Sequence, residues 1–340
     1  MIARNDGGSA LTTSRRRTRL LVVLPALNEA ASLKQVLDRV PRSLPGIDQV
    51  ELLVVDDGST DETVAIARAC GASVISHGRN RGVGAAMQTG IDEAVRRRVD
   101  YAVNVDADGQ FAPEDIPVVL APVLEGRADF ATASRFKDPA LVPEMPKVKR
   151  WGNAQMSRIV SAILGAEYHD VSCGFRAYSR ETLLQLVLSG AFTYTQESFL
   201  ALGQKGLRIV EVPLAVRGVR EHGKSRVASS ITRYALKTSS IIFRFLRDYS
   251  PGVFFNTASA LFAVVGLGFA IFFISHRIVA GQFTPHIWSG FVAGFLFAVG
   301  FVVFALGQVA SMIARLFALQ EKQLYFARKY LPNDDTDAPP

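Results

Sequence analysis

Two long apolar segments without a charged side chain constrain the fold of this chain more than any other feature. Residues 252–275 and 287–313 contain no Asp, Glu, Lys or Arg. A helix of about 20 apolar residues crosses the hydrocarbon core of a bilayer, and a buried helix of a soluble protein rarely reaches this length without a charge. The sequence therefore predicts a transmembrane hairpin of two helices over residues 251–314.

Basic residues flank this hairpin on its outer sides and give it an orientation. Arg244 and Arg247 precede it, residues 315–340 contain four Lys or Arg, and the short linker 276–286 contains one Arg. The positive-inside rule then predicts a multi-pass protein of a bacterial-type inner membrane, with both termini and the preceding domain in the cytosol. Residues 229–250 combine apolar and basic side chains, which predicts an amphipathic helix in the bilayer interface or, alternatively, a helix packed on the preceding domain.

Composition limits the remaining classes of protein. A net charge of +7 fits nucleic acid, an anionic membrane surface or phosphorylated substrates. Because no nucleic-acid-binding module is recognisable, nucleic acid is not an expected partner. Cys70 and Cys173 are too far apart for a zinc motif or a disulfide framework and are expected to be reduced thiols. Residues 1–19 are small, polar and basic, which predicts a disordered basic tail rather than a signal peptide.

Residues 20–134 alternate short apolar runs with helical patterns, and this alternation predicts an α/β fold. Strands of about five residues between helices indicate a mostly parallel, Rossmann-like sheet with helices on both faces. Further helical segments and one more strand extend the same domain to residue 228. The predicted strands are 20–24, 51–55, 72–76, 101–105, 129–133 and 207–212, and the predicted helices are 29–40, 61–70, 82–98, 114–125, 151–164, 180–188 and 196–203.

Polar clusters follow five successive strands of this domain. Ligands of open α/β sheets bind at the carboxyl ends of the strands, so the clusters are expected to meet at one rim and to form a binding site there. The clusters are Asn28-Glu29, Asp56-Asp57, Asn80-Arg81, Asp106-Ala107-Asp108 and Ser134-Arg135.

The pair Asp106 and Asp108 ends an apolar strand, and this spacing suits a hard divalent cation. Mg²⁺ or Mn²⁺ takes oxygen ligands and bridges to substrate phosphates. A solvated acidic turn is the plain alternative. Asp56 and Asp57 can accept hydrogen bonds from a base or a ribose hydroxyl, which predicts a nucleotide contact.

Neighbouring turns suggest helix caps and further ligand contacts. Asp61 is expected to cap the next helix, and Asn28 can be a helix cap alone, which leaves Glu29 as the better candidate for a nucleoside contact. The turn of Arg81 and Gly82 opens a helix, and its free amides would suit a diphosphate.

Taken together, these segments resemble the family-2 glycosyltransferases with a GT-A fold, and among them the dolichyl- or polyprenyl-phosphate sugar transferases. The resemblance extends from residue 20 to the end of the apolar segments. Family members often carry an aromatic residue where Leu27 stands and Lys where Arg226 stands. The matching segments are PALNE (25–29), VVDDGSTD (54–61), NRGVGAAMQTG (80–90), DADGQ (106–110), ASRF (133–136), SCGFRAYSR (172–180), YTQE (194–197), EVP (211–213) and REHGKSR (220–226).

The resemblance implies an inverting hexosyltransferase of cell-envelope glycan biosynthesis. The donor would be a GDP- or UDP-linked sugar, and the acceptor a membrane lipid, undecaprenyl or dolichyl phosphate. A transferase that acts on a lipid hydroxyl, with Asp108 as its base, and a non-catalytic membrane scaffold are the alternatives. A homo-oligomer is left open.

The resemblance also implies a role for individual residues. Nucleotide-sugar contacts are expected at Pro25, Asn28, Glu29, Asp56, Asp57, Arg81, Gly82 and Asp106. The metal ligands would be Asp106, Asp108 and Gln110, and the catalytic residues Asp108, Arg135, Arg176 and Glu197. The acceptor phosphate would be held by Arg135, Arg176, Arg220, Lys224, Ser225 and Arg226.

Overall fold

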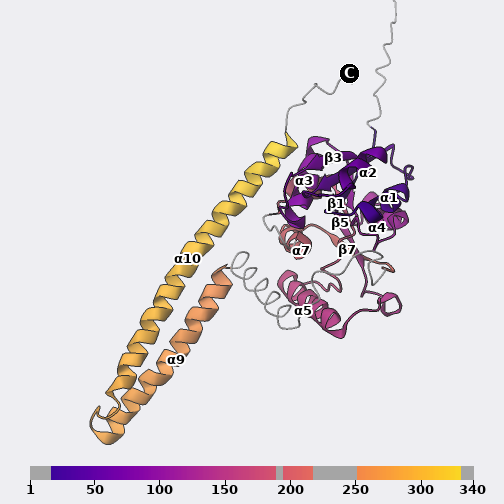
Figure 1. Ribbon diagram of the computed structural model, residues 1–340. Coiled ribbons are helices and arrows are strands. Elements are labelled where there is room, and N and C mark those ends of the chain that lie inside the picture. Colours follow the sequence, from indigo (N-terminus) through magenta and orange to yellow (C-terminus); the bar gives the residue numbers. More distant parts are fainter. Residues whose placement is uncertain (1–16, 189–193, 217–250, 331–340) are drawn as a thin grey trace, which may run out of the picture. The chain divides into compact units, whose positions relative to one another are not determined.

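The computed structural model describes residues 17–188, 194–216 and 251–330 (Figure 1). The contacts divide the chain into two compact units, Met1–Ser225 and Arg226–Pro340. Most of the predicted tail 1–19, the amphipathic helix 229–250 and the basic loop with Arg220, Lys224, Ser225 and Arg226 lie outside the described residues.

The first unit is built on a seven-stranded sheet with the strand order β3-β2-β1-β4-β6-β5-β7. The pairs β1–β2, β1–β4, β2–β3 and β5–β7 are parallel, whereas β6 is antiparallel to both β4 and β5. The predicted Rossmann-like, mostly parallel sheet is confirmed. The strands are β1 (Arg19–Ala26), β2 (Gln49–Asp56), β3 (Ser73–Ser76), β4 (Tyr101–Asn104), β5 (Phe130–Ser134), β6 (Arg176–Ser179) and β7 (Ile209–Pro213).

Helices follow the strands of this sheet in the predicted alternation. They are α1 (Ala30–Asp38), α2 (Thr63–Ala69), α3 (Val83–Arg96), α4 (Ile116–Leu124), α5 (Lys147–Leu164), α6 (Arg180–Gln185) and α7 (Tyr194–Gln204). Two short 3₁₀ helices, η1 (Pro113–Asp115) and η2 (Pro139–Leu141), lie before α4 and α5. Figure 1 shows the strands in the middle of this unit with helices around them.

The central strand β1 is buried on both faces, which explains its continuous apolar run. Leu20, Val22 and Leu24 belong to a core cluster that also contains side chains of α1 and α4. Successive side chains of a strand point to opposite faces, and Val23 meets α3 on the other face. A Cβ at Gly90 of α3 would lie 2.5 Å from a methyl carbon of Val23, so a glycine is needed for this close approach.

Two elements differ from the sequence prediction in this unit. Strand β6 was not expected, because its four residues show no apolar alternation and it is stabilised by pairing with β4 and β5. Helix α5 begins at Lys147, directly after Pro146 as its N-cap, and not at residue 151. Proline is well tolerated at the beginning of a helix, where its missing N–H is no loss.

The second unit contains the two apolar helices, α9 (Pro251–Ala280) and α10 (Ile287–Lys329). Both are long and apolar enough to cross a membrane, with a mean hydropathy of 2.3 in their most apolar windows. Glycines allow the two helices to approach closely, and a Cβ at Gly307 would lie 2.5 Å from Cβ of Phe255. Helix α10 has 43 residues and continues well beyond the apolar run that predicted it.

Candidate active site

The strand register brings the predicted polar clusters to one edge of the sheet. Ala26 of β1 lies opposite Asp56 of β2, and Val23 lies opposite Asn104 of β4. Because β6 is antiparallel, its first residue, Arg176, lies opposite Asn104 at this same edge. The ends of β1, β2 and β4 and the beginning of β6 therefore form one rim.

A buried polar network supports Asp106 at this rim. The fully buried Asn104 donates from its side-chain amide to Gly174 O and to the Tyr194 hydroxyl (3.2 Å), and it accepts from the Tyr178 hydroxyl at 2.9 Å. Burial raises the pKa of Tyr178 to about 12 and that of Tyr194 well above its ordinary value, and the negative charge of Asp106 adds to both shifts. Both hydroxyls therefore stay protonated and neutral beside Asp106.

Gly174 lies directly against the carboxylate of Asp106. A Cβ at this position would lie 2.7 Å from Oδ2 of Asp106 and 3.1 Å from the Tyr194 hydroxyl. A real Cβ atom does not come this close to an oxygen, so only glycine leaves the carboxylate in its place. The sequence prediction had included Gly174 in a matching segment without giving it a role.

The loop that carries the two aspartates is tied to α1. The Ser32 hydroxyl donates to Ala107 O at 2.8 Å, and the Asp108 carboxylate, 6% exposed, accepts from the amide of Gln110 at 3.0 Å. Within residues 17–188, 194–216 and 251–330, no group of three or more His, Cys, Asp or Glu side chains could hold a metal ion. Two carboxylates and the amide oxygen of Gln110 nevertheless suit Mg²⁺ or Mn²⁺, because Mg²⁺ in particular binds through few protein ligands and substrate phosphates.

Asp56 and Asp57 follow β2, and both are buried at the rim. Asp56 accepts from the Ser59 amide at 2.9 Å and from the Ser76 hydroxyl at 2.6 Å. Burial alone would raise the pKa of Asp56, but these hydrogen bonds outweigh it and lower the pKa. Asp56 therefore stays ionised at neutral pH, and its contact with a nucleoside remains a prediction.

The amides of the turn before α3 were predicted to be free for a diphosphate, and this prediction is wrong because they bind Asp57. Its carboxylate accepts from the amides of Arg81 (2.9 Å) and Gly82 (2.8 Å) and contacts Nδ1 of His77 at 2.8 Å. These two amides are thus occupied by an internal anion and do not face a diphosphate. The Arg81 side chain is exposed and can still bind one.

The turns after β1 and β2 hold each other in place. Asn28, with a φ of 54°, accepts from the Thr60 amide at 2.8 Å. Asp61 accepts from the amides of Ala30 and Thr63, both at 3.1 Å. These are the first residues of α1 and α2, so the expected capping role of Asp61 serves both helices, although the N-cap positions themselves are Glu29 and Glu62.

Arg135 lies at the end of β5 and is held by Asp170. Nε and Nη2 of the guanidinium donate to the two carboxylate oxygens at 2.7 and 2.8 Å, and Nη2 also donates to the Ser172 hydroxyl. Burial alone would lower the pKa of Arg135, but Asp170 raises it, with a smaller contribution from the nearby Asp106. Glu211 in turn accepts from the Asp170 amide at 2.7 Å, which fixes the loop that carries Asp170.

Arg176 is enclosed and does not match the predicted contact with an acceptor phosphate. It is fully buried, and its guanidinium lies 5.4–5.5 Å from the ring centroids of Phe130, Tyr194 and Phe199. It donates to the carbonyl oxygens of Cys173 and Thr195, both at 2.8 Å. Arg176 therefore braces the segment before β6 against α7.

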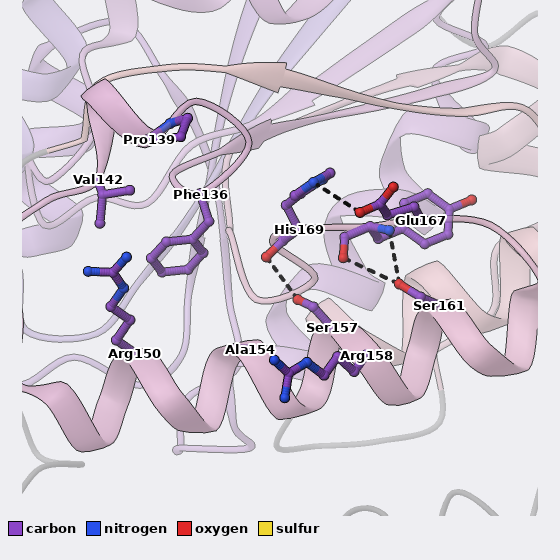
Figure 2. A pocket seen from close by; sticks show the side chains of 11 residues that line it. Phe136, Pro139, Val142, Arg150, Ala154, Ser157, Arg158, Ser161, Glu167 and His169 are labelled. Atoms are coloured by element: carbon purple, nitrogen blue, oxygen red, sulfur yellow. Dashed lines mark hydrogen bonds and ion pairs between the residues drawn. The ribbon is translucent and has the colours of Figure 1, made fainter.

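A cavity of about 450 Å³ adjoins the Arg135–Asp170 pair (Figure 2). Phe136, under the guanidinium of Arg135 at 5.2 Å, and His169, next to Asp170, both line it. Ser157 of α5 donates to His169 O at 2.9 Å and closes its inner side. The other lining residues are Pro139, Val142, Arg150, Ala154, Arg158, Ser161, Glu167 and Tyr168, none of which was predicted as a site residue.

Comparison with known proteins identifies the family. The model of glycosyl transferase family 2 matches residues 21–186. The polyprenol monophosphomannose synthase of Mycolicibacterium smegmatis is 33% identical over 67% of this chain and 88% of its own length. This chain belongs to glycosyl transferase family 2.

Two further relatives of this family-2 transferase extend the comparison. The dodecaprenyl-phosphate galacturonate synthase of Rhizobium johnstonii is 28% identical over 94% of both chains. Among solved structures, glucosyl-3-phosphoglycerate synthase from Mycobacterium tuberculosis, in complex with Mn²⁺, UDP and phosphoglyceric acid, matches with a TM-score of 0.50 and 25% identity, over 68% of this chain and 78% of that chain. The seven-stranded sheet is thus the GT-A sheet expected from the sequence.

The remaining predicted residues of this family-2 transferase have simple positions. Pro25 lies in β1 opposite Val55, and Glu197 lies on α7, half-buried. Glu29 is the N-cap of α1, and its carboxylate accepts from the Ser32 hydroxyl at 3.2 Å. Their contacts with substrate remain predictions.

Proposed function

We propose that this protein is an inverting glycosyltransferase that moves a hexose from a GDP- or UDP-linked donor to a polyprenyl phosphate, with polyprenyl-phospho-sugar as the product. The observation that carries the proposal is the match to the Rhizobium galacturonate synthase over 94% of both chains, because it includes the two apolar helices as well as the sheet. The Mycolicibacterium relative, named for a polyprenol phosphosugar, supports the same class of acceptor.

The charges at the rim suit a reaction between two anionic substrates. A lipid phosphate is already ionised at neutral pH, so its oxygen can attack the anomeric carbon without a general base. Attack from the side opposite the leaving diphosphate inverts that carbon. The exposed Arg81 and Arg135, which lies near Asp106 and is oriented by Asp170, are guanidinium groups that could bind the phosphates of the two substrates.

A divalent cation is part of the proposal. Asp106, Asp108 and Gln110 would hold it, and it would neutralise charge on the diphosphate of the donor. The Mn²⁺ and UDP bound together in the Mycobacterium tuberculosis transferase support this assignment. Gly174 leaves room for the Asp106 carboxylate, and the buried Asn104 network lies next to it, which supports a defined position for this residue.

The two apolar helices support a membrane location, which is where a polyprenyl phosphate acceptor would be. We propose that both helices span the bilayer and that the catalytic unit lies in the cytosol, where nucleotide-sugars are made. An acceptor with a long isoprenoid chain leaves the bilayer only at a large cost in hydrophobic free energy. An active site tethered to the bilayer avoids that cost.

The test is transfer by the purified full-length protein in nanodiscs. Radiolabelled UDP- and GDP-sugars are offered with Mn²⁺, and the acceptors are undecaprenyl phosphate, undecaprenol and diacylglycerol. We expect label in the lipid phase only with undecaprenyl phosphate. Transfer to a hydroxyl lipid would instead favour the alternative acceptor class. No release of nucleoside diphosphate with any donor would favour a non-catalytic scaffold.

We expect Asp108→Asn to lower kcat/KM by about 100-fold or more, because it removes a ligand charge from the cation and the diphosphate. The asparagine can still accept from the Gln110 amide, so the fold is retained. Asp38→Asn, an exposed change in α1, is the matched control and should leave transfer unchanged. Equal activity of the two variants across a Mn²⁺ titration would contradict the metal assignment.

A further inference from the structure

Helix α5 presents an unusual exposed face to its surroundings. Trp151 is 60% exposed, and the exposed Lys147, Arg150 and Arg158 lie on the same side of the helix. With 100° per residue, these four positions and Ala154 fall within an arc of about 100°. The opposite side of the helix is buried through Asn153, Met156 and Val160, among others.

The charge of this face has one sign. Helix α5 contains four basic residues and no acidic one, and the nearest acidic residues in the sequence are Glu144 before it and Glu167 after it. Tryptophan is enriched at protein interfaces and in the head-group belts of membranes, because its ring system is apolar at one end and carries an N–H at the other. Tryptophan with Lys and Arg around it is the combination typical of helices at a membrane–water interface.

The cavity beside Arg135 opens on the same face. Arg150, Ala154 and Arg158 line the cavity, and all three are exposed. Figure 2 shows Arg150 and Arg158 on α5 and the apolar side chains of Phe136 and Val142 across from Arg150. Arg150 and Arg158 thus bring two positive charges to the cavity against one negative charge from the exposed Glu167, and Phe136 and Val142 make it partly apolar within. This balance suits a layer of anionic head groups above apolar tails.

We propose that the exposed face of α5 docks on the anionic lipid surface of the bilayer, with Trp151 at the level of the head groups. The partner is the lipid surface itself. Because the same chain carries the two apolar helices, the bilayer is within reach of this unit. Docking would present the cavity and Arg135 to the lipid phase. This contact rests on the proposed membrane location of the two apolar helices and not on the chemistry of sugar transfer.

The chain has two tryptophans, Trp151 and Trp288, and this allows a direct test with the full-length protein. The Trp288→Phe variant carries Trp151 alone and is placed in nanodiscs of either phosphatidylcholine or phosphatidylcholine with phosphatidylglycerol. Brominated lipid and aqueous acrylamide then report whether Trp151 faces lipid or water. The Trp151→Phe variant, with Trp288 alone, is the positive control for lipid contact. If Trp288→Phe folds poorly, the difference between wild type and Trp151→Phe gives the same signal.

We expect brominated lipid to quench Trp151 in phosphatidylglycerol nanodiscs, and acrylamide to quench it less there than in phosphatidylcholine. Neutralising Lys147 or Arg158 with Gln should each shift this contact by about 5-fold toward water, while Gln155→Ala serves as the uncharged control on α5. Quenching by acrylamide alone in both lipids would overturn the proposal. Protection from both quenchers would overturn it as well, because Trp151 would then lie against protein.

Discussion

At the scale of single residues, Gly174 has the most demanding position at the rim. Its φ is outside the left-handed region, so the backbone would accept an alanine, and the only obstacle is the contact with Asp106 and the Tyr194 hydroxyl. Position 174 thus requires glycine because a side chain has no room beside the Asp106 carboxylate. The contact connects the segment before β6 with the loop that carries Asp106 and Asp108.

We expect Gly174→Ala to displace the Asp106 carboxylate and to raise the Mn²⁺ concentration needed for half-maximal transfer by about 10-fold, since a misplaced group at a site commonly costs this much or more. The melting temperature should fall only slightly. Gly268→Ala, where a Cβ meets nothing within 4 Å, is the matched control. An unchanged Mn²⁺ dependence in Gly174→Ala would show that Asp106 does not bind the cation.

The sequence indicated which residues gather at the rim but not what each of them holds. Asp56, Asp106 and Arg135 lie at strand ends as predicted, because the carboxyl ends of parallel strands share one edge. Several partners of Asp57 and Arg176 are backbone groups of other segments, such as the Arg81 amide for Asp57 and Thr195 O for Arg176. Such partners leave no trace in the residue types, so these two roles required the structure.

At the scale of elements, a helix or strand was predictable where its own sequence carries a periodic or apolar pattern. A strand that is stabilised only by hydrogen bonds to neighbouring strands was not predictable. The alternation over residues 20–134 was confirmed element by element, since several strands carry a continuous apolar run, such as residues 20–24 of β1 and 52–55 of β2. Strand β6 depends on hydrogen bonds to β4 and β5, which are far away in the sequence. Helix α10 extends beyond the predicted apolar run, which ends at residue 313. Charged residues end an apolar run, but they do not end a helix.

Helix α3 is joined to the sheet by an ion-pair cluster that responds to pH. Glu93 accepts from Arg96 at 2.8 Å and from Arg97 at 2.6 Å, and Arg97 also contacts Glu51 of β2 at 3.1 Å. Hydrogen bonds, first from Arg96 and then from Arg97, lower the pKa of Glu93 to about 2 against the effect of burial. The stabilisation by Glu93 is therefore complete above its unfolded pKa of 4.5 and is lost as the pH falls toward 2.

We expect Glu93→Gln to lower the free energy of unfolding at pH 7 by about 1–2 kcal/mol, after allowance for solvent screening. The difference from wild type should shrink between pH 4.5 and pH 2, because the wild-type carboxyl becomes neutral there. Thermal unfolding of the full-length protein in detergent, followed by circular dichroism across this range, gives the measurement. Asp92→Asn on the exposed side of α3 is the control. A difference that stays constant with pH would argue against a role for the charge.

At the scale of the whole molecule, the chain combines a folded α/β unit with a helical hairpin. The two units differ in how their apolar side chains are covered, since strands such as β1 are buried by helices whereas most side chains of α9 and α10 are exposed. An exposed apolar surface of this extent is typical of a membrane or protein contact. The orientation of the hairpin then decides on which side of the membrane the rim lies.

We expect the linker between the helices to face the outside of the cell, because the basic residues lie at the other ends. A membrane-impermeant thiol reagent should label Gln282→Cys in intact cells. It should label Gln323→Cys, near the end of α10, only after permeabilisation. Wild type, with Cys173 buried and Cys70 half-buried, gives the background. The reverse pattern would place the transferase unit outside and contradict a cytosolic donor.

The antiparallel course of β6 has a consequence for which part of the chain can vary. The segment that enters β6 is anchored at its beginning, where Glu211 holds Asp170, and at its end, where Arg176 holds Cys173 O. The stretch from η2 through α5 lies between Arg135 and this anchored segment. We therefore expect this stretch to tolerate changes of length and sequence while Asp170 and Arg176 keep their positions, because both ends of the following segment are fixed independently of it.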